Sequence, residues 1–229
     1  MSEYGEHLWC GQLRSARYEK PDNSDPFDRD VILLRHVEDG KRVLELGCST
    51  GYITRRLLQK KCTVTGIEND SEAARAARTT GARVLDRDLN SEDRFAGLQP
   101  EFDVVLMGDV LEHLVNPYEV LRQVRDLLSE GGYIVVCLPN VVHWLTRLQI
   151  ALGQFSYQSV GTLDATHLRF FTPRSAHCMI EEAGYRLLKF HPIIGGRLSG
   201  HFRPAWQRLA HLRPGLFAYQ LLICAAPCP

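Results

Sequence analysis

The sequence lacks a net charge, because 27 Lys and Arg residues balance 27 Asp and Glu residues. Domains that bind nucleic acid usually carry an excess of basic residues along one face, which neutralises phosphates. The chain also lacks an Asn-Pro-Pro-Tyr type of motif, which would hold a base flipped out of a duplex. We therefore expect no nucleic acid among the partners of this protein.

Long hydrophobic runs are also missing. The most apolar late segment, residues 216–227, is far shorter than the roughly 20 residues that a membrane-spanning helix needs. The first residues, Met-Ser-Glu-Tyr-Gly-Glu-His, show no basic region followed by an apolar stretch, so no signal peptide is visible. These absences predict a cytoplasmic protein with no membrane span.

Cysteine pairs with the spacing of a disulfide framework or a zinc site are absent. Several of the seven cysteines fall within apolar, strand-like runs, which favours buried free thiols in a reducing compartment. Cys224 and Cys228 leave open a metal or redox pair, but the sequence predicts no metal site. The cysteines are Cys10, Cys48, Cys62, Cys137, Cys178, Cys224 and Cys228.

The length of 229 residues and the apolar fraction of 45% fit one domain with a sizeable core. We expect a single domain over residues 1–229. Within it we expect an N-terminal extension over residues 1–25, an insert over 140–171 and a second insert over 194–215. The first insert follows a strand at the edge where open α/β sheets bind their ligands, so we expect it to cover a substrate pocket.

Strand-like and helix-like patterns alternate through residue 140, which predicts a parallel sheet with helices on both faces and right-handed crossovers. Two further strand-like runs follow a helix that begins at Thr172-Pro173. The strands are expected at 42–46, 63–68, 83–87, 103–107, 133–138, 185–191 and 217–225. The helices are expected at 27–38, after Gly51, at 72–78, after Asn116-Pro117, at 141–152 and up to Gly184.

The most informative motif is the turn after the first strand, Arg-Val-Leu-Glu-Leu-Gly-Cys-Ser-Thr-Gly over residues 42–51. Its glycines allow a ligand close to the backbone, and Glu68 at the end of the next strand can bind ribose hydroxyls. The turn lacks the Gly-Lys-Ser/Thr of a phosphate-binding loop and has Ser49 where a dinucleotide fingerprint has its middle glycine. Glu45 would repel a pyrophosphate but not a sulfonium beside an ammonium group.

These features resemble motif I of class I S-adenosylmethionine-dependent methyltransferases, and Ser49 departs from its usual middle glycine. Later strand ends match in the family's order: Asp88, then Phe102 to Asp109, then the glycine pair before Tyr133. The resemblance implies a Rossmann-like, doubly wound, seven-stranded, mostly parallel α/β sheet with an antiparallel edge strand, and S-adenosylmethionine as cofactor. The implied cofactor-binding residues are Glu45, Gly47, Cys48, Ser49, Gly51, Tyr52, Glu68, Asn69, Asp88, Leu89, Gly108, Asp109 and Val110.

The insert over 140–171 is similar to that of a small bacterial subgroup. Pro139-Asn140, a following His-Trp pair and the run Thr-His-Leu-Arg-Phe-Phe-Thr over 166–172 carry this similarity. The subgroup contains ubiquinone-type O-methyltransferases and the methionine-biosynthesis methyltransferase-like protein. The resemblance implies methyl transfer to a small-molecule acceptor, with O-methylation favoured, and it leaves the acceptor unnamed.

A sulfonium is already an activated methyl donor, so the chemistry requires no metal. A hydroxyl acceptor must lose its proton to a group within hydrogen-bond reach. The candidate bases, in order, are His167, His143 and His113. Asp164 lies three residues before His167 and can orient its imidazole, although a structural role for each histidine is the alternative.

Two alternatives to this enzyme remain open from the sequence. The chain could bind S-adenosylmethionine as a non-catalytic partner subunit of a biosynthetic enzyme. It could also be a nicotinamide-dependent oxidoreductase on a similar sheet, against which Glu45 and the missing middle glycine argue. We expect a monomer or a homodimer.

Overall fold

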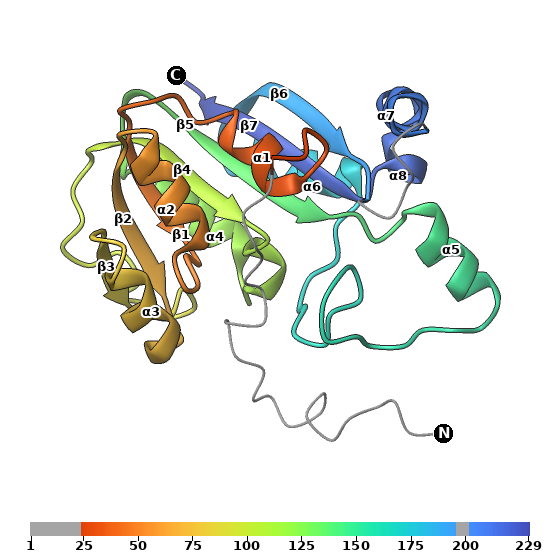
Figure 1. The fold of residues 1–229 in the computed structure, drawn as a ribbon, viewed down its shortest axis with the longest axis horizontal. Coiled ribbons are helices and arrows are strands. Elements are labelled where there is room, and N and C mark those ends of the chain that lie inside the picture. Colours follow the sequence, from red (N-terminus) through yellow and green to blue (C-terminus); the bar gives the residue numbers. More distant parts are fainter. Residues whose placement is uncertain (1–23, 196–201) are drawn as a thin grey trace.

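The computed structural model describes residues 24–195 and 202–229, so nearly all of the expected extension over 1–25 lies outside the described residues. Strands from both described ranges form one seven-stranded sheet in the order β3-β2-β1-β4-β5-β7-β6 (Figure 1). The strands are β1 (Arg42–Leu46), β2 (Thr63–Glu68), β3 (Arg83–Asp86), β4 (Phe102–Gly108), β5 (Leu128–Pro139), β6 (Tyr185–Ile193) and β7 (Gln220–Pro227).

Strands β1 to β5 pair in parallel, whereas β7 runs antiparallel to both of its neighbours, β5 and β6. The predicted fold class is confirmed. The antiparallel strand is the last one in the chain, and it lies one position in from the edge that β6 occupies. The helices are α1 (Arg29–Leu34), α2 (Tyr52–Gln59), α3 (Ser71–Arg78), η3 (Leu111–His113, a 3-10 turn), α4 (Pro117–Arg125), α5 (Trp144–Ala151), α6 (Pro173–Glu182), α7 (Arg203–Leu212) and α8 (Pro214–Phe217).

Local sequence signals explain where several helices begin. The Asp70 carboxylate accepts hydrogen bonds from the backbone at the start of α3, as side-chain oxygens do at helix N-termini. Asn116 caps α4, which has proline at its first position. Thr172 and Ser175 form a reciprocal capping box at the start of α6.

The helix expected over 27–38 is shorter in the structure. Asp28 caps it and it ends after Leu34, so α1 has 6 residues. The helix expected over 141–152 begins at Trp144, because the backbone before it bonds to Phe171 and Asn140 instead. The insert expected over 194–215 contains α7 and the first half of α8 in its described part.

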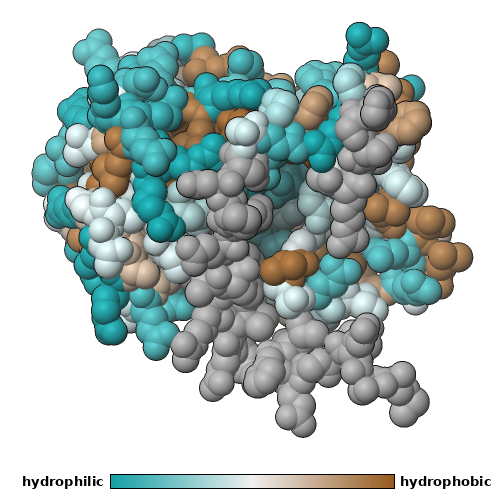
Figure 2. All heavy atoms as spheres, in the orientation of Figure 1, coloured by the Kyte–Doolittle hydropathy of each residue, from teal (hydrophilic) through white to brown (hydrophobic). Residues whose placement is uncertain are grey.

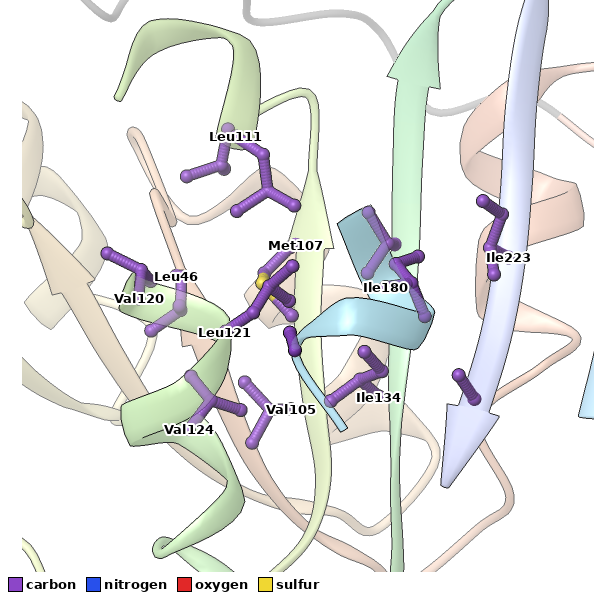
Figure 3. Packing of buried hydrophobic residues seen from close by; sticks show 14 of the residues in the cluster. Leu46, Val105, Met107, Leu111, Val120, Leu121, Val124, Ile134, Ile180 and Ile223 are labelled. Atoms are coloured by element: carbon purple, nitrogen blue, oxygen red, sulfur yellow. The ribbon is translucent and has the colours of Figure 1, made fainter. Parts of the chain in front are cut away.

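The core has two faces. Side chains from α4 and α6 pack on one face of the sheet, and side chains from α1 and α2 pack on the other. Figure 3 shows the first face, where Leu121 of α4 lies beside Val105 and Met107 of β4. Helix α3 packs through Ala74 and Ala77 in a smaller cluster. The core therefore supports the central strands from both sides.

The described cysteines are free thiols. Cys48, Cys62, Cys137 and Cys224 are buried, and Cys178 and Cys228 are exposed, so Cys224 and Cys228 form no disulfide. Across the described ranges, the longest apolar helices fall short of a membrane crossing.

Leu121→Ala should destabilise the protein, because the Leu121 side chain is completely buried between α4 and the sheet. Removing a buried leucine side chain costs about 2–5 kcal/mol through lost burial and the cavity that remains. Urea unfolding should report this loss. The matched control Leu212→Ala removes an exposed side chain of α7 and should change the free energy of unfolding by less than about 0.5 kcal/mol. Equal stability of the two variants would contradict this core assignment.

Candidate functional site

A cavity of about 600 Å³ lies at the carboxyl ends of β1, β2 and β4. Residues 160–167 of the insert close its other side. This is the place where an open parallel sheet binds its ligand. Its lining includes the predicted residues Gly47, Ser49, Tyr52, Glu68, Asn69, Asp88, Leu89, Gly108, Asp109, Val110, His113 and His167.

The turn after β1 depends on three residues with left-handed backbone. Gly47, Ser49 and Gly51 have φ of 65°, 49° and 84°. Ser49 therefore adopts the conformation for which the family's usual glycine is suited. Its backbone N–H donates to Glu68 Oε2 at 2.9 Å, a hydrogen bond that holds the turn against the end of β2.

Glu68 occupies the position expected of a ribose-binding carboxylate. It is buried at the end of β2 and lines the cavity. Its second oxygen, Oε1, accepts a hydrogen bond from the backbone N–H of Asp70 at 2.9 Å. Both oxygens are thus held by the protein backbone, which fixes the orientation of the carboxylate.

Three predicted cofactor residues lie outside the cavity lining. The buried carboxyl of Glu45 lies under the turn and accepts a hydrogen bond from Thr54 Oγ1 at 2.6 Å. Cys48 packs against Gly66, and Gly51 packs against Ala77 of α3. These three residues therefore pack on the side of the turn that faces away from the cavity, where they support its shape.

Burial weakens the electrostatic argument that the sequence placed on Glu45. Loss of solvent raises the pKa of the Glu45 carboxyl to about 8, although the Thr54 hydrogen bond favours the ionised form. A carboxyl with that pKa is mostly neutral at pH 7. Its repulsion of a pyrophosphate is therefore smaller than its formal charge implies.

An arginine that the sequence analysis missed lies on the floor of the cavity. The buried Arg29 guanidinium of α1 donates to Asp109 Oδ2 at 2.8 Å and to Tyr52 Oη at 3.0 Å. Gln220 of β7 donates to both oxygens of Asp109. A sequence signal was present, because Arg29 lies three and four residues before the apolar Ile32 and Leu33 and so shares their face of the helix.

Asp109 departs from the ordinary strand conformation, with φ of 58° directly after β4. This left-handed turn is uncommon for a residue with a side chain. The hydrogen bonds to Arg29 and Gln220 and the backbone bond from Asp109 N–H to Cys137 O at 3.1 Å hold it there. The cavity floor therefore carries an adjacent cation and anion.

Asp88 and Leu89 line the cavity just beyond the carboxyl end of β3. Asp88 follows β3, and its carboxylate accepts a hydrogen bond from Asn90 N–H at 2.8 Å. The buried Leu89 contributes an apolar side chain to the cavity. A carboxylate beside an apolar surface can bind the amino group and the ring of an adenine base.

Two of the three candidate bases meet at the far side of the cavity. The rings of His113 and His167 lie edge to face with centroids 4.8 Å apart. The Nε2 atom of His167 is 4.0 Å from Glu112 Oε1. The Glu112–His113–His167 cluster joins η3 to the insert, and of its members the sequence predicted only the two histidines as site residues.

Glu112 is completely buried. Loss of solvent, with a further contribution from the nearby Asp109 carboxylate, raises the pKa of Glu112 well above its ordinary value. Burial also lowers the pKa of His113, and His167 adds to that shift. Perturbed titratable groups in a cavity are typical of functional sites.

His143, the third candidate base, lies outside the cavity lining. It precedes α5, and its ring packs against Trp144 and Tyr219. Burial lowers the pKa of His143 to about 4. A base of that pKa accepts a proton poorly near neutrality.

Backbone hydrogen bonds hold the insert over the cavity. The Glu112 carbonyl accepts from the N–H groups of Leu168 and Arg169 at 2.8 and 3.0 Å. At the base of the insert, the Asn140 side-chain amide donates to Ala218 O at 2.7 Å. Helix α5 and its following loop extend beside the sheet (Figure 1). The apolar surface of the insert is exposed (Figure 2), including Trp144, Leu145, Leu148, Ile150, Leu152 and Phe155.

Comparisons with known proteins identify the class. A family model described as a methyltransferase domain matches residues 16–189. The chain is 30% identical over 203 residues to the ubiquinone biosynthesis O-methyltransferase of Pseudomonas aeruginosa (strain LESB58), with 87% of each chain covered. The protein therefore belongs to the methyltransferase-domain family and is a class I S-adenosylmethionine-dependent methyltransferase.

Solved structures support the fold. A SAM-dependent methyltransferase of Thermotoga maritima superposes with a TM-score of 0.61 at 18% identity, covering 88% of this chain and 89% of that chain. One from Archaeoglobus fulgidus gives a TM-score of 0.61 at 18% identity, covering 86% and 94%. The predicted family, fold, enzyme class and cofactor are confirmed, which removes the oxidoreductase alternative.

His143→Phe should alter how stability depends on pH. His143 has a pKa of about 4 in the folded protein and about 6.5 when unfolded. Between these values the unfolded state binds more protons, so this residue lowers stability as pH falls from 6.5 to 4. The variant should lose up to about 1.4 kcal/mol per pH unit from that slope. Urea unfolding at several pH values tests this, and an unchanged slope would refute the assigned burial.

Proposed function

We propose that this enzyme transfers the methyl group of S-adenosylmethionine to a hydroxyl group of a small-molecule acceptor. The observation that carries the proposal is that one cavity combines a ribose-type carboxylate, Glu68, with the Glu112–His113–His167 cluster. The similarity to ubiquinone biosynthesis O-methyltransferases supports oxygen as the acceptor atom.

In this proposal the cofactor spans the cavity from β3 to β4. Glu68 accepts hydrogen bonds from the ribose hydroxyls, and Asp88 and Leu89 bind the adenine. The Arg29–Asp109 pair offers opposite charges 2.8 Å apart, which match the carboxylate and ammonium of the methionine portion. The remaining predicted residues contribute backbone at the turn (Gly47, Ser49), at β2 (Asn69) and at β4 (Gly108, Val110), with Tyr52 beside Arg29.

The acceptor then binds between the sulfonium methyl group and the insert. His167 Nε2 is our candidate for the group that removes the hydroxyl proton. The oxygen forms a bond to the methyl carbon while the carbon–sulfur bond breaks, and its electron pair returns to sulfur as S-adenosylhomocysteine leaves. Alignment of the reacting atoms can supply roughly 7–11 kcal/mol of the barrier.

We extend the proposal to the organisation of the protein. Strands from Arg42 to Pro227 share one sheet, which supports a single domain with the segment 140–171 as its substrate lid. Buried free thiols at Cys48, Cys62 and Cys137 support a reducing, cytoplasmic location. A monomer or homodimer is our working assembly.

Methyl transfer to paired acceptors tests the reaction. With S-adenosylmethionine, phenols and catechols should yield S-adenosylhomocysteine, whereas aniline and benzylamine analogues of the same size should yield less than about a hundredth as much, because an amine does not use the same deprotonation. Mass spectrometry of the product identifies the methylated atom. Turnover of the amines alone would contradict O-methylation.

Glu68→Gln tests whether the cofactor binds in this cavity. Loss of the charged acceptor should cost about 1.5–3 kcal/mol of cofactor binding, which is roughly a ten- to hundredfold rise in the dissociation constant. Calorimetry with S-adenosylhomocysteine measures it. Glu72→Gln, on the exposed first turn of α3, is the matched control and should bind normally. Equal binding by both variants would contradict the ribose assignment.

A further inference from the structure

The Glu112–His113–His167 cluster has the composition of a metal site. One carboxylate oxygen and one nitrogen from each imidazole all lie within 4.8 Å of one another. Glu112 and His113 are neighbours on η3, and His167 comes from the insert more than 50 residues later. The sequence prediction contained no metal site, because Glu112 was not grouped with the distant His167.

The Glu112 carboxylate supplies an independent observation. Its side chain has no exposed surface, and both of its oxygens lack a hydrogen-bond partner among the described residues. The contact with His167 Nε2 at 4.0 Å is too long for a hydrogen bond. Buried carboxylates are normally hydrogen-bonded, paired or bound to a metal. Glu112 lines the cavity, so a ligand there can reach these oxygens.

The two imidazoles are oriented as metal ligands usually are. His113 Nδ1 is 3.2 Å from Thr166 O, and His167 Nδ1 is 3.2 Å from Thr162 O. A backbone carbonyl only accepts hydrogen bonds, so in a neutral ring each Nδ1 carries the hydrogen and each Nε2 keeps its lone pair. Metal-binding histidines in proteins are typically held by such a bond from their other nitrogen.

We propose that Glu112, His113 and His167 bind a divalent transition-metal cation, with its remaining coordination positions open to the cavity. Two imidazoles and one carboxylate suit Zn²⁺, Mn²⁺, Fe²⁺ or Co²⁺ better than Mg²⁺ or Ca²⁺, which prefer oxygen ligands. Metal–ligand bonds of roughly 2.0–2.2 Å place neighbouring ligand atoms about 3–3.5 Å apart, so these atoms, which lie within 4.8 Å of one another, must draw together by up to roughly 1–2 Å on binding.

The cation would serve the O-methylation set out under Proposed function, and its role rests on that proposal. The acceptor hydroxyl oxygen coordinates the cation, which lowers the pKa of the hydroxyl as it does for bound water. The O–H bond breaks and the proton passes to water in the cavity. The oxygen then attacks the methyl carbon, and the carbon–sulfur electron pair returns to sulfur. With the cation bound, His167 is a metal ligand and water takes the proton; His167 is the base only if the site binds no cation.

Binding of Co²⁺ to the chelator-treated full chain tests the site. Equilibrium dialysis should give one bound Co²⁺ per chain, with the weak visible absorption of nitrogen and oxygen ligands and without the intense near-ultraviolet band of a thiolate ligand. Glu112→Gln keeps the side-chain shape but removes the charge, and it should weaken binding by at least roughly tenfold. His167→Gln should do the same.

His211→Ala is the matched control, because His211 is an exposed histidine of α7 outside the cavity lining, and it should bind Co²⁺ like the unmodified chain. Equal Co²⁺ affinity in all variants, or no stoichiometric binding, would overturn the metal site. Calorimetry with S-adenosylhomocysteine separates the two proposals. Normal cofactor binding without Co²⁺ binding would reject only the metal, whereas loss of cofactor binding by the unmodified chain would reject the proposed function.

Discussion

The parallel pairing of β1, β2 and β4 is the constraint on which the site depends. Because these strands run in one direction, their carboxyl ends meet at one edge, and Glu68, Asp109 and the turn after β1 converge there. Asp109 and Glu112 lie on the same short segment after β4. Asp109 contacts Arg29, whereas Glu112 lies beside His167. Methyl donor and acceptor can therefore meet over the end of one strand.

A buried carboxyl group without a hydrogen-bond partner is the main cost of this arrangement. Asp109 is balanced by Arg29 at 2.8 Å and by Gln220, whereas Glu112 has no comparable partner among the described residues. The backbone carbonyl of Glu112 also binds the insert at Leu168 and Arg169. The same residue thus ties the insert to the segment after β4 and presents an unsatisfied carboxyl group to the cavity.

The sequence predicted most of the fold, since alternating strand and helix patterns and strand-end carboxylates have local signatures. It also placed Glu68 and Asp109 at the cavity, whereas it gave no sign that Ser49 adopts the left-handed φ of the glycine that the family usually has there. Arg29, Glu112 and Gln220 were missed as site residues because their roles depend on tertiary contacts 80, 55 and 111 residues away. For the same reason, the burial that raises the pKa of Glu45 and the packing of His143 outside the cavity lining have no local signature.

A crystal structure with S-adenosylhomocysteine tests the central claim most directly. We predict that the ribose hydroxyls bind Glu68, that the amino-acid portion binds the Arg29–Asp109 pair, and that the sulfur faces the Glu112–His113–His167 cluster across the acceptor space. A nucleoside bound away from Glu68, or a sulfur directed away from that cluster, would contradict the account.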